Sequence, residues 1–190
     1  MKVNKKKYTI AQILPALNTG GVERGVVEIS KSLVENDFKS IVISSGGHMV
    51  SQITRNGGLH YNLNVHSKNP LKWPKIRNQL KIILKNENVD LIHFCSRAPA
   101  WIGFPLGAIL DIPIVTSVHM RFRKSNFFKK YYNSILTKGN TIIAISRHIE
   151  ESIKNSFPKV SKKIKIIHRG VDLDLFNPSK INPARIIAQS

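Results

Sequence analysis

The sequence predicts an α/β fold, a Rossmann-like doubly wound parallel sheet with helices on both faces. Short β-rich runs alternate with helical patterns along the chain, and such alternation is typical of β-α-β units joined by right-handed crossovers. The chain has 190 residues, 42% of them hydrophobic, which is enough to bury the core of one domain. Near its start, a strand pattern, a glycine pair and an amphipathic helix pattern follow one another. We therefore expect one globular domain built on a parallel sheet.

Seven runs are predicted to be strands, because each is short and rich in β-branched or aromatic residues. They are residues 8–14, 40–44, 59–63, 91–94, 113–118, 141–145 and 163–167. Apolar residues recur at helical spacing in residues 22–36 and 73–88, which predicts a helix in each of these segments. The apolar positions are Val22, Val26, Ile29 and Leu33 in the first helix and Ile76, Leu80, Ile83 and Leu84 in the second. Helices are expected in the other gaps between strands.

The turn between the first strand and the first helix is a candidate anion site. Gly20 and Gly21 lack side chains, so a phosphate can reach the backbone N–H groups of the first helical turn, where the helix dipole also favours negative charge. A glycine-rich turn is also common in α/β proteins that bind nothing there, and this alternative stays open. No GxGxxG follows the first strand and no acidic residue ends the second, which argues against a dinucleotide-dependent oxidoreductase.

The composition of the chain indicates which classes of partner it can bind and which compartment suits it. Thirty Lys and Arg against 11 Asp and Glu give a formal net charge of +19, which predicts attraction to polyanions. Nucleic acid is not expected, because no helix-turn-helix, zinc-finger or RNP pattern is present. The single cysteine, Cys95, excludes an internal disulfide and suits a reducing cytoplasm. The apolar N-terminal run is interrupted by Gln12 and Pro15, so neither an export signal nor a transmembrane helix is expected.

Polar and basic residues follow most of the predicted strands. Because the carboxyl ends of parallel strands meet at one edge of the sheet, these segments should converge there, and that edge is the expected ligand site. The segments are residues 18–24, 44–48, 93–97, 119–124, 146–148 and 168–172.

Four segments together resemble the N-terminal domain of family-4 glycosyltransferases, which are retaining GT-B enzymes. They are LPALNTGGVERG, VDLIHFCSRAPAWIGF, IPIVTSVHMRFR, and TIIAISRHIEESI followed by IKIIHRGVDLDLFNP. Their order and spacing fit the family across essentially the whole chain. The stretches SRAPAW and RGVDLDLFNPSKINPAR look most like bacterial lipopolysaccharide-type sugar transferases.

The resemblance implies a domain organisation. Residues 1–178 would form the acceptor-side half of a GT-B fold, and residues 179–190 would begin an interdomain linker or helix. The family's second domain, which holds the nucleotide and supplies a Glu-x7-Glu motif, has no counterpart in this sequence. The expectation is therefore a fragment, a truncated product, or a subunit whose partner chain supplies the C-terminal domain.

The resemblance also implies roles for individual residues. His119 would lie over the donor sugar and the reaction centre, and Gly20 and Gly21 would approach the donor diphosphate. His119 and Glu23 are the catalytic candidates. Glu23 would cap the helix or orient the acceptor, although a favourable charge in the first turn of a helix explains it equally well. Candidate acceptor-binding residues are Arg24, Ser96, Arg97 and Arg121.

No cofactor and no metal ion are expected, since the nucleotide sugar is a substrate. Asp172 and Asp174 spell a DxD, but they follow the last predicted strand and precede Phe176-Asn177-Pro178, so turn formation explains them more simply than metal binding. The pair His168-Arg169 stands where many family members have Tyr-Asn. This difference leaves the turn intact and the role of Arg169 open.

A basic, aromatic segment lies between Asp111 and Glu150, where the chain has no acidic residue. Cations neutralise anionic headgroups while aromatic rings settle at the membrane interface. The alternative is a solvated basic helix whose aromatic residues face the core. Candidate membrane-binding residues are Arg123, Lys124, Phe127, Phe128, Lys129 and Lys130.

The expected function follows from these points. A sugar would pass from a nucleotide sugar to a lipid-linked or lipopolysaccharide-type acceptor, in the cytoplasm, on an enzyme held peripherally at the inner face of the cell membrane. A lone chain would be incomplete. The alternative is a non-catalytic Rossmann-like module that binds anions on a membrane or a nucleic acid.

Overall fold

A computed structural model describes residues 7–122 and 126–170. Seven strands form one sheet in the order β3-β2-β1-β4-β5-β6-β7, and every neighbouring pair is parallel. The strands are β1 (Thr9–Ile13), β2 (Lys39–Ser44), β3 (Leu59–Asn62), β4 (Leu91–Phe94), β5 (Ile114–Val118), β6 (Thr141–Ala144) and β7 (Ile164–Ile166). All seven predicted strands are confirmed, each end lying within one residue of its expected place.

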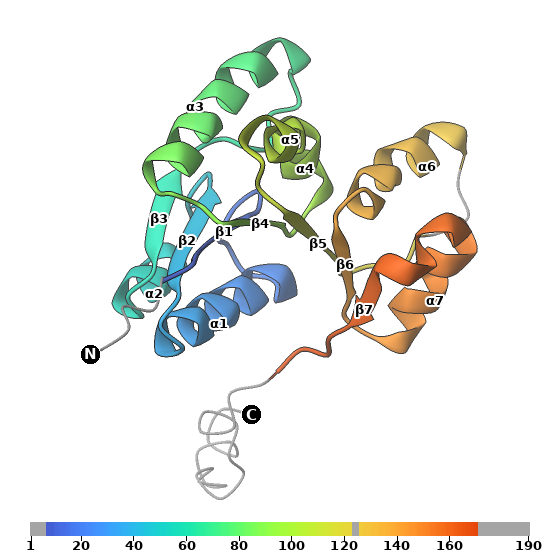
Figure 1. Ribbon diagram of the computed structural model, residues 1–190, viewed down its shortest axis with the longest axis horizontal. Coiled ribbons are helices and arrows are strands. Elements are labelled where there is room, and N and C mark those ends of the chain that lie inside the picture. Colours follow the sequence, from blue (N-terminus) through green and yellow to red (C-terminus); the bar gives the residue numbers. More distant parts are fainter. Residues whose placement is uncertain (1–6, 123–125, 171–190) are drawn as a thin grey trace, which may run out of the picture.

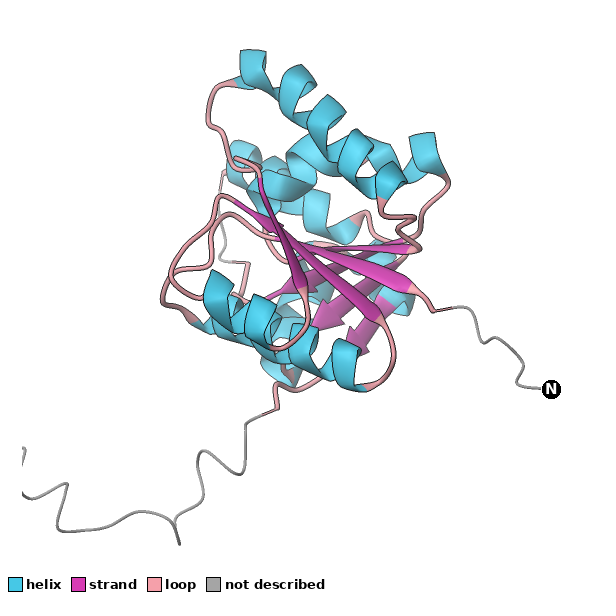
Figure 2. Cartoon of the chain, turned by 90° about the vertical axis from the view of Figure 1, so that its left-hand side faces the viewer, coloured by secondary structure: helices cyan, strands magenta, loops and turns pink. Residues whose placement is uncertain are grey.

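The helices lie on both faces of the sheet, as predicted (Figures 1 and 2). The two helices with the clearest periodicity are confirmed as α1 (Gly21–Glu35) and α3 (Trp73–Asn86). The other helices are short: α2 (Val50–Arg55), α4 (Arg97–Gly103), α5 (Pro105–Leu110), α6 (Phe127–Ser134) and α7 (Arg147–Ser156), with 3-10 turns η1 (Pro70–Lys72), η2 (Ile135–Thr137) and η3 (Pro158–Lys163). Among the described helices, none combines the length and the apolar character that a bilayer-spanning helix requires.

The two faces of the sheet are packed differently. Alternate strand side chains, including Ile13, Phe94 and Ile142, join residues of α3, α4, α5 and α7 in one large core. The opposite face carries a smaller core beneath α1 and α2, which includes Val26, Val42 and Ile53. In Figure 1, α1 lies on the opposite side of the sheet from α3, beneath β1 and β2.

On the α1 face, side chains in β6 and directly after β6 and β7 remain partly open to solvent. Ile143 and Ile145 are only half-buried, and Ile167 is 54% exposed. Within the described ranges, α1 and α2 are the helices on this face, and the smaller core beneath them holds no residue of β5, β6 or β7. The polypeptide therefore leaves an opening beside α1 at the carboxyl edge of the sheet.

Candidate active site at the carboxyl edge of the sheet

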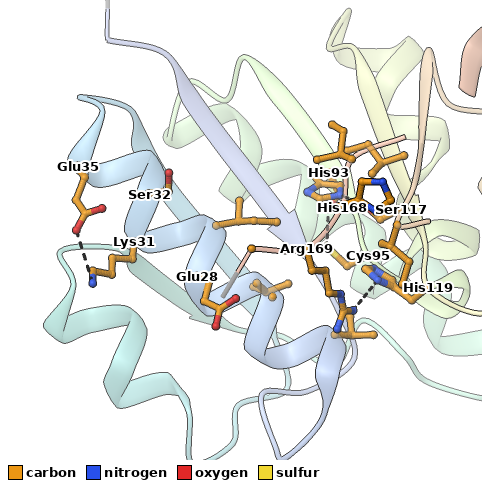
Figure 3. A pocket seen from close by; sticks show the side chains of 18 residues that line it. Glu28, Lys31, Ser32, Glu35, His93, Cys95, Ser117, His119, His168 and Arg169 are labelled. Carbon is orange, nitrogen blue, oxygen red and sulfur yellow. Dashed lines mark hydrogen bonds and ion pairs between the residues drawn. The ribbon is translucent and has the colours of Figure 1, made fainter. Parts of the chain in front are cut away.

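A cavity of about 420 Å³ occupies this opening (Figure 3). One wall is α1, which contributes Val22, Gly25 and Ile29. The floor comes from β4 and β5 and the residues that follow them, and the far rim from the end of β7. The lining residues with polar or ionisable side chains on that floor and rim are His93, Cys95, Ser117, His119, His168 and Arg169. The cavity thus lies where the switch-point rule predicts a ligand site.

Arg169 reaches across the mouth of this cavity. Its Nη2 lies 2.8 Å from Nδ1 of His119, and Figure 3 shows the two side chains pointing toward each other. A Cβ added to Gly21 would lie 2.7 Å from Nη1 of Arg169, and one added to Gly25 would lie 3.9 Å from its Cζ. The two glycines stand four positions apart, on one face of α1. Their missing side chains leave the space that the guanidinium occupies.

His119 follows β5 and carries a neutral ring. Burial, helped by the Arg169 charge and by His93, lowers the pKa of His119 to about 4. Because a guanidinium can only donate, Nδ1 must accept the hydrogen bond from Arg169, and the ring proton is then assigned to Nε2. Nε2 is buried, and no described residue gives it a hydrogen-bond partner. His119 therefore presents a neutral N–H group that lacks an acceptor.

His93 and Ser117 lie deeper in the floor. His93 Nε2 and Ser117 Oγ are 2.6 Å apart, and burial lowers the pKa of His93 to about 4. Burial also raises the pKa of the Cys95 thiol to about 12, so this thiol stays protonated at neutral pH and is a poor nucleophile. The floor is thus polar but uncharged, and Arg169 supplies the positive charge above it.

Burial of neutral His93 makes stability depend on pH. The unfolded chain takes up a proton on this residue near pH 6.5, whereas the folded chain does so only near pH 4. Stability from this residue is therefore complete above pH 6.5 and is lost as the pH falls to 4. The shift corresponds to about 3 kcal/mol. We expect the free energy of unfolding, measured with urea, to fall between pH 7 and pH 4 in both proteins. The fall in His93→Gln should be smaller than the fall in the wild-type chain by about 3 kcal/mol.

The comparison of these two proteins isolates His93 from its neighbours. Cys95, His119 and Arg169 face the same cavity, and His119 titrates in the same range, but these three residues are present in both proteins. Equal losses in the two proteins would show that His93 is not buried as a neutral ring.

The glycine pair and Glu23 lie together at the start of α1. Gly20 is the N-cap residue, and its carbonyl accepts the first helical hydrogen bond, from Arg24 N–H at 3.0 Å. The Glu23 carboxylate lies against Gly20, in the first turn, where the helix dipole favours negative charge. Glu23 does not line the cavity that holds His119. This position fits the helix-terminus interpretation of Glu23, and its predicted role toward an acceptor stays a prediction.

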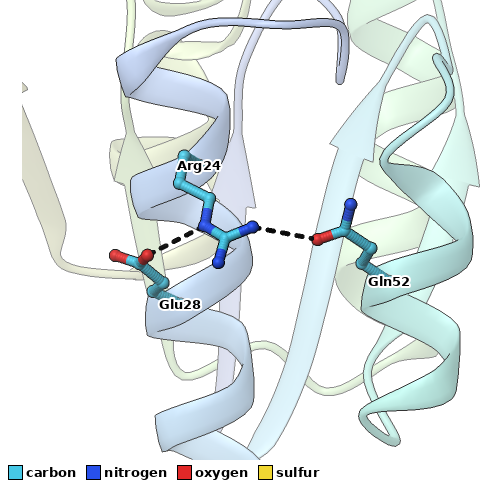
Figure 4. Close-up of polar contacts among 3 residues, drawn as sticks. All are labelled: Arg24, Glu28 and Gln52. Carbon is cyan, nitrogen blue, oxygen red and sulfur yellow. Dashed lines mark hydrogen bonds and ion pairs between the residues drawn. The ribbon is translucent and has the colours of Figure 1, made fainter. Parts of the chain in front are cut away.

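The four predicted acceptor-binding residues lie outside this cavity. Arg24 donates to Glu28 Oε1 at 2.9 Å and to Gln52 Oε1 at 3.5 Å, which ties α1 to α2 (Figure 4). Arg97 donates to Asn133 Oδ1 at 2.6 Å and so joins α4 to α6. Ser96 is the N-cap residue of α4. These contacts are of a kind that stabilises the scaffold.

Arg121, the fourth of these residues, lines a separate cavity of about 560 Å³. The other residues there are Phe122, His148, Glu151, Ser152, Asn155 and Ser156. The structure therefore does not bring Arg121 to His119.

The predicted membrane-binding surface is partly visible. Phe127 and Phe128 at the start of α6 are 77% and 79% exposed, and Lys129 and Lys130 are exposed as well. The alternative, in which these aromatic residues face the core, is wrong for both phenylalanines. Arg123 and Lys124 lie outside the described residues, as do Asp172 and Asp174. Among the described residues, no group of His, Cys, Asp and Glu is arranged to hold a metal ion.

Part of the floor and the role of Arg169 were not predicted. His93 falls in one of the segments expected at this edge but was given no role, and Ser117, inside the strand β5, falls in none of them. One signal pointed to Arg169: Gly21 and Gly25 share a helix face, and glycine inside a helix lowers its stability unless another group needs the space.

Comparison with known proteins identifies the family. A glycosyltransferase from Rickettsia africae ESF-5 is 37% identical and has a TM-score of 0.81, over 96% of this chain and 48% of its own. Anabaena HepE, solved in complex with UDP and glucose, is 15% identical with a TM-score of 0.74, over 95% of this chain and 48% of its own. Spore coat protein SA of Bacillus subtilis (strain 168) is 24% identical over 164 residues, which are 86% of this chain and 41% of that protein.

The chain thus spans about half the length of these relatives. Residues 19–175 match the sequence family named Glycosyltransferase Family 4. This match covers most of the chain and includes both glycines and the His119 and Arg169 positions. The chain belongs to Glycosyltransferase Family 4.

Proposed function

We propose that this chain is the N-terminal half of a retaining GT-B glycosyltransferase that takes its sugar from a nucleotide-sugar donor. The observation that carries the proposal is the arrangement of the two groups that line this cavity, the Arg169 guanidinium and the neutral ring of His119. Gly20 and Gly21 are not among the lining residues, but Gly21 in the first turn of α1 lies against the Arg169 guanidinium. In this proposal the donor diphosphate lies near Gly20 and Gly21, and the sugar lies beside His119.

Charge favours an anion at this place. Arg169 donates to a neutral imidazole, so that hydrogen bond leaves its positive charge uncompensated. The guanidinium also lies against the first turn of α1, where the helix dipole is positive. A diphosphate would compensate the Arg169 charge and would accept hydrogen bonds from the planar guanidinium. Anabaena HepE has been solved with UDP-glucose, which supports a nucleotide sugar as the donor.

The test uses a joined enzyme, which we define as residues 1–190 followed by the second half of the Rickettsia africae glycosyltransferase. Radiolabelled UDP, GDP and ADP sugars are offered with bacterial lipid extracts as acceptors. We expect transfer from one nucleotide class, with the anomeric configuration of the donor retained in the product. A correctly folded joined enzyme that transfers from none of these donors would contradict the proposal and favour a module that only binds anions.

A lipid-linked or lipopolysaccharide-type acceptor at a membrane surface is the second part of the proposal. The start of α6 presents the exposed rings of Phe127 and Phe128, and Lys129 and Lys130 lie beside them. Tyr131 is also 58% exposed, so one short helix exposes both aromatic rings and positive charge. This combination is typical of segments that rest in the interface of an anionic bilayer.

We predict that the 190-residue chain sediments with anionic vesicles and not with neutral ones, and that salt releases it. Each Lys near such a surface contributes about 1 kcal/mol, so the double variant Lys129→Glu/Lys130→Glu should bind at least about tenfold more weakly. The matched control is Lys75→Glu/Lys85→Glu, which makes the same charge change at exposed positions of α3. Equal weakening of the two variants would show that net charge, and not the α6 surface, drives binding.

A further inference from the structure

We propose that Arg169 is a positioning residue for His119, and that its hydrogen bond holds the imidazole ring in the form that carries its proton on Nε2. The tautomer itself stands on the geometry alone. Its consequence for sugar transfer rests on the proposed function above.

The contact permits only one arrangement of hydrogen atoms. All five N–H groups of a guanidinium donate, and none of its nitrogens accepts. With Nη2 of Arg169 at 2.8 Å from Nδ1 of His119, a proton on Nδ1 would point at another donor. Nδ1 therefore carries no proton and accepts the hydrogen bond, and the ring proton is on Nε2. In a histidine ring, the hydrogen bond made by one nitrogen determines whether the other nitrogen carries the proton.

The consequence appears on the opposite side of the ring. Nε2 is buried, and no described residue accepts a hydrogen bond from it. A buried donor without a partner is unfavourable, and an oxygen atom of a bound ligand would remove that cost. With Arg169 in place, His119 is thus a fixed donor toward an acceptor oxygen, such as a sugar hydroxyl. Without Arg169, the ring is free to take the other tautomer, in which Nε2 no longer donates.

Two glycines on one face of α1 allow Arg169 to reach this position. A methyl group at Gly21 would lie 2.7 Å from Nη1, so the guanidinium would have to move. A methyl group at Gly25 would lie 3.9 Å from Cζ, at ordinary contact distance. The substitutions Gly21→Ala and Gly25→Ala therefore form a matched pair, since only the first displaces Arg169.

The test is NMR of the 190-residue chain labelled with ¹⁵N in its histidine rings, with the His119 signals assigned from their absence in His119→Gln. In the wild-type chain at pH 7, we expect Nδ1 to be unprotonated and Nε2 protonated. Arg169→Met, which keeps the length of the side chain and removes its donors, should convert the ring to a mixture of tautomers. Arg169→Lys should restore the wild-type pattern, Gly21→Ala should weaken it, and Gly25→Ala should leave it unchanged.

A proton on Nδ1 in the wild-type chain would overturn the proposal, and so would an unchanged pattern in Arg169→Met. In the joined enzyme, Arg169→Met should lower kcat about tenfold or more with little change in KM, and Arg169→Lys should recover part of the loss, as expected for loss of a tautomer-fixing partner. The tautomer is measured without turnover. A joined enzyme that is inactive with every donor would count against the proposed function and leave the tautomer result standing. An active one whose kcat does not respond to Arg169→Met would overturn the positioning role.

Discussion

His119→Ala in the joined enzyme is expected to lower kcat by about 100-fold or more, which is the scale of removing one preorganised polar contact in a closed site. The neutral ring presents a buried Nε2–H that no described residue satisfies. A donor held in this way costs little free energy to align when charge develops on the ligand as the glycosidic bond breaks. Removing the donor should therefore lower kcat. The melting temperature should stay nearly unchanged, because His119 is only half-buried and lines the cavity.

The control is His60→Ala. His60 is also partly buried, and its Nε2 lies 2.9 Å from Ser44 Oγ, but it lies on the edge strand β3, and the cavity lining does not include it. This variant should lose stability and keep its rate. If His119→Ala instead gave a near-normal kcat and a large fall in melting temperature, His119 would be a scaffold residue and the proposed sugar contact would lose its main side chain.

The second large effect concerns the enzyme as a whole. A polypeptide limited to these 190 residues is expected to give turnover at least about 1,000-fold below that of the joined enzyme, because orientation of the donor and stabilisation of the leaving diphosphate each contribute several kcal/mol. The described cavity is open on one side, and Arg169 is the only cation among its lining residues close to the glycine pair. In the proposed function, the second half of the joined enzyme supplies the remaining contacts.

The assay compares both proteins at equal concentration with the same donors and acceptors. Robust transfer by the purified 190-residue chain, with a rate proportional to its concentration, would contradict this expectation. It would show that the cavity beside α1 is sufficient for catalysis.

The strands could be predicted closely because central parallel strands are buried on both faces, so they appear as short apolar runs with sharp ends. The bounds of the short helices α4 and α5 could not be predicted in this way. Both helices contain or begin with proline, and they are fixed by tertiary packing. At Gly103, for example, a Cβ would lie 2.8 Å from the ring of Phe94, so this helix end fits its place only without a side chain.

A cavity lies at the edge of the sheet where the sequence predicts a ligand, but several of the predicted side chains do not line it. Arg24 lies in α1 and Arg97 begins α4, and each donates a hydrogen bond to a neighbouring helix and does not line the cavity. Spacing along the chain does not tell which side of a helix a long side chain takes. The contact of Arg169 with Gly21 depends on where β7 joins the sheet, which no local pattern encodes.

The place of β1 between β2 and β4 has a consequence for the order of folding. Ile10 pairs with Ser40 on one side and with Leu91 on the other. The first pairing closes a short loop through α1, whereas the second must bring together segments separated by β2, β3 and α3, at a greater cost in chain entropy. Folding of such a chain is slowed by its distant contacts. The second pairing also sets His93 beside Gln12, so the floor of the cavity should be completed only when the slowest step of folding has passed.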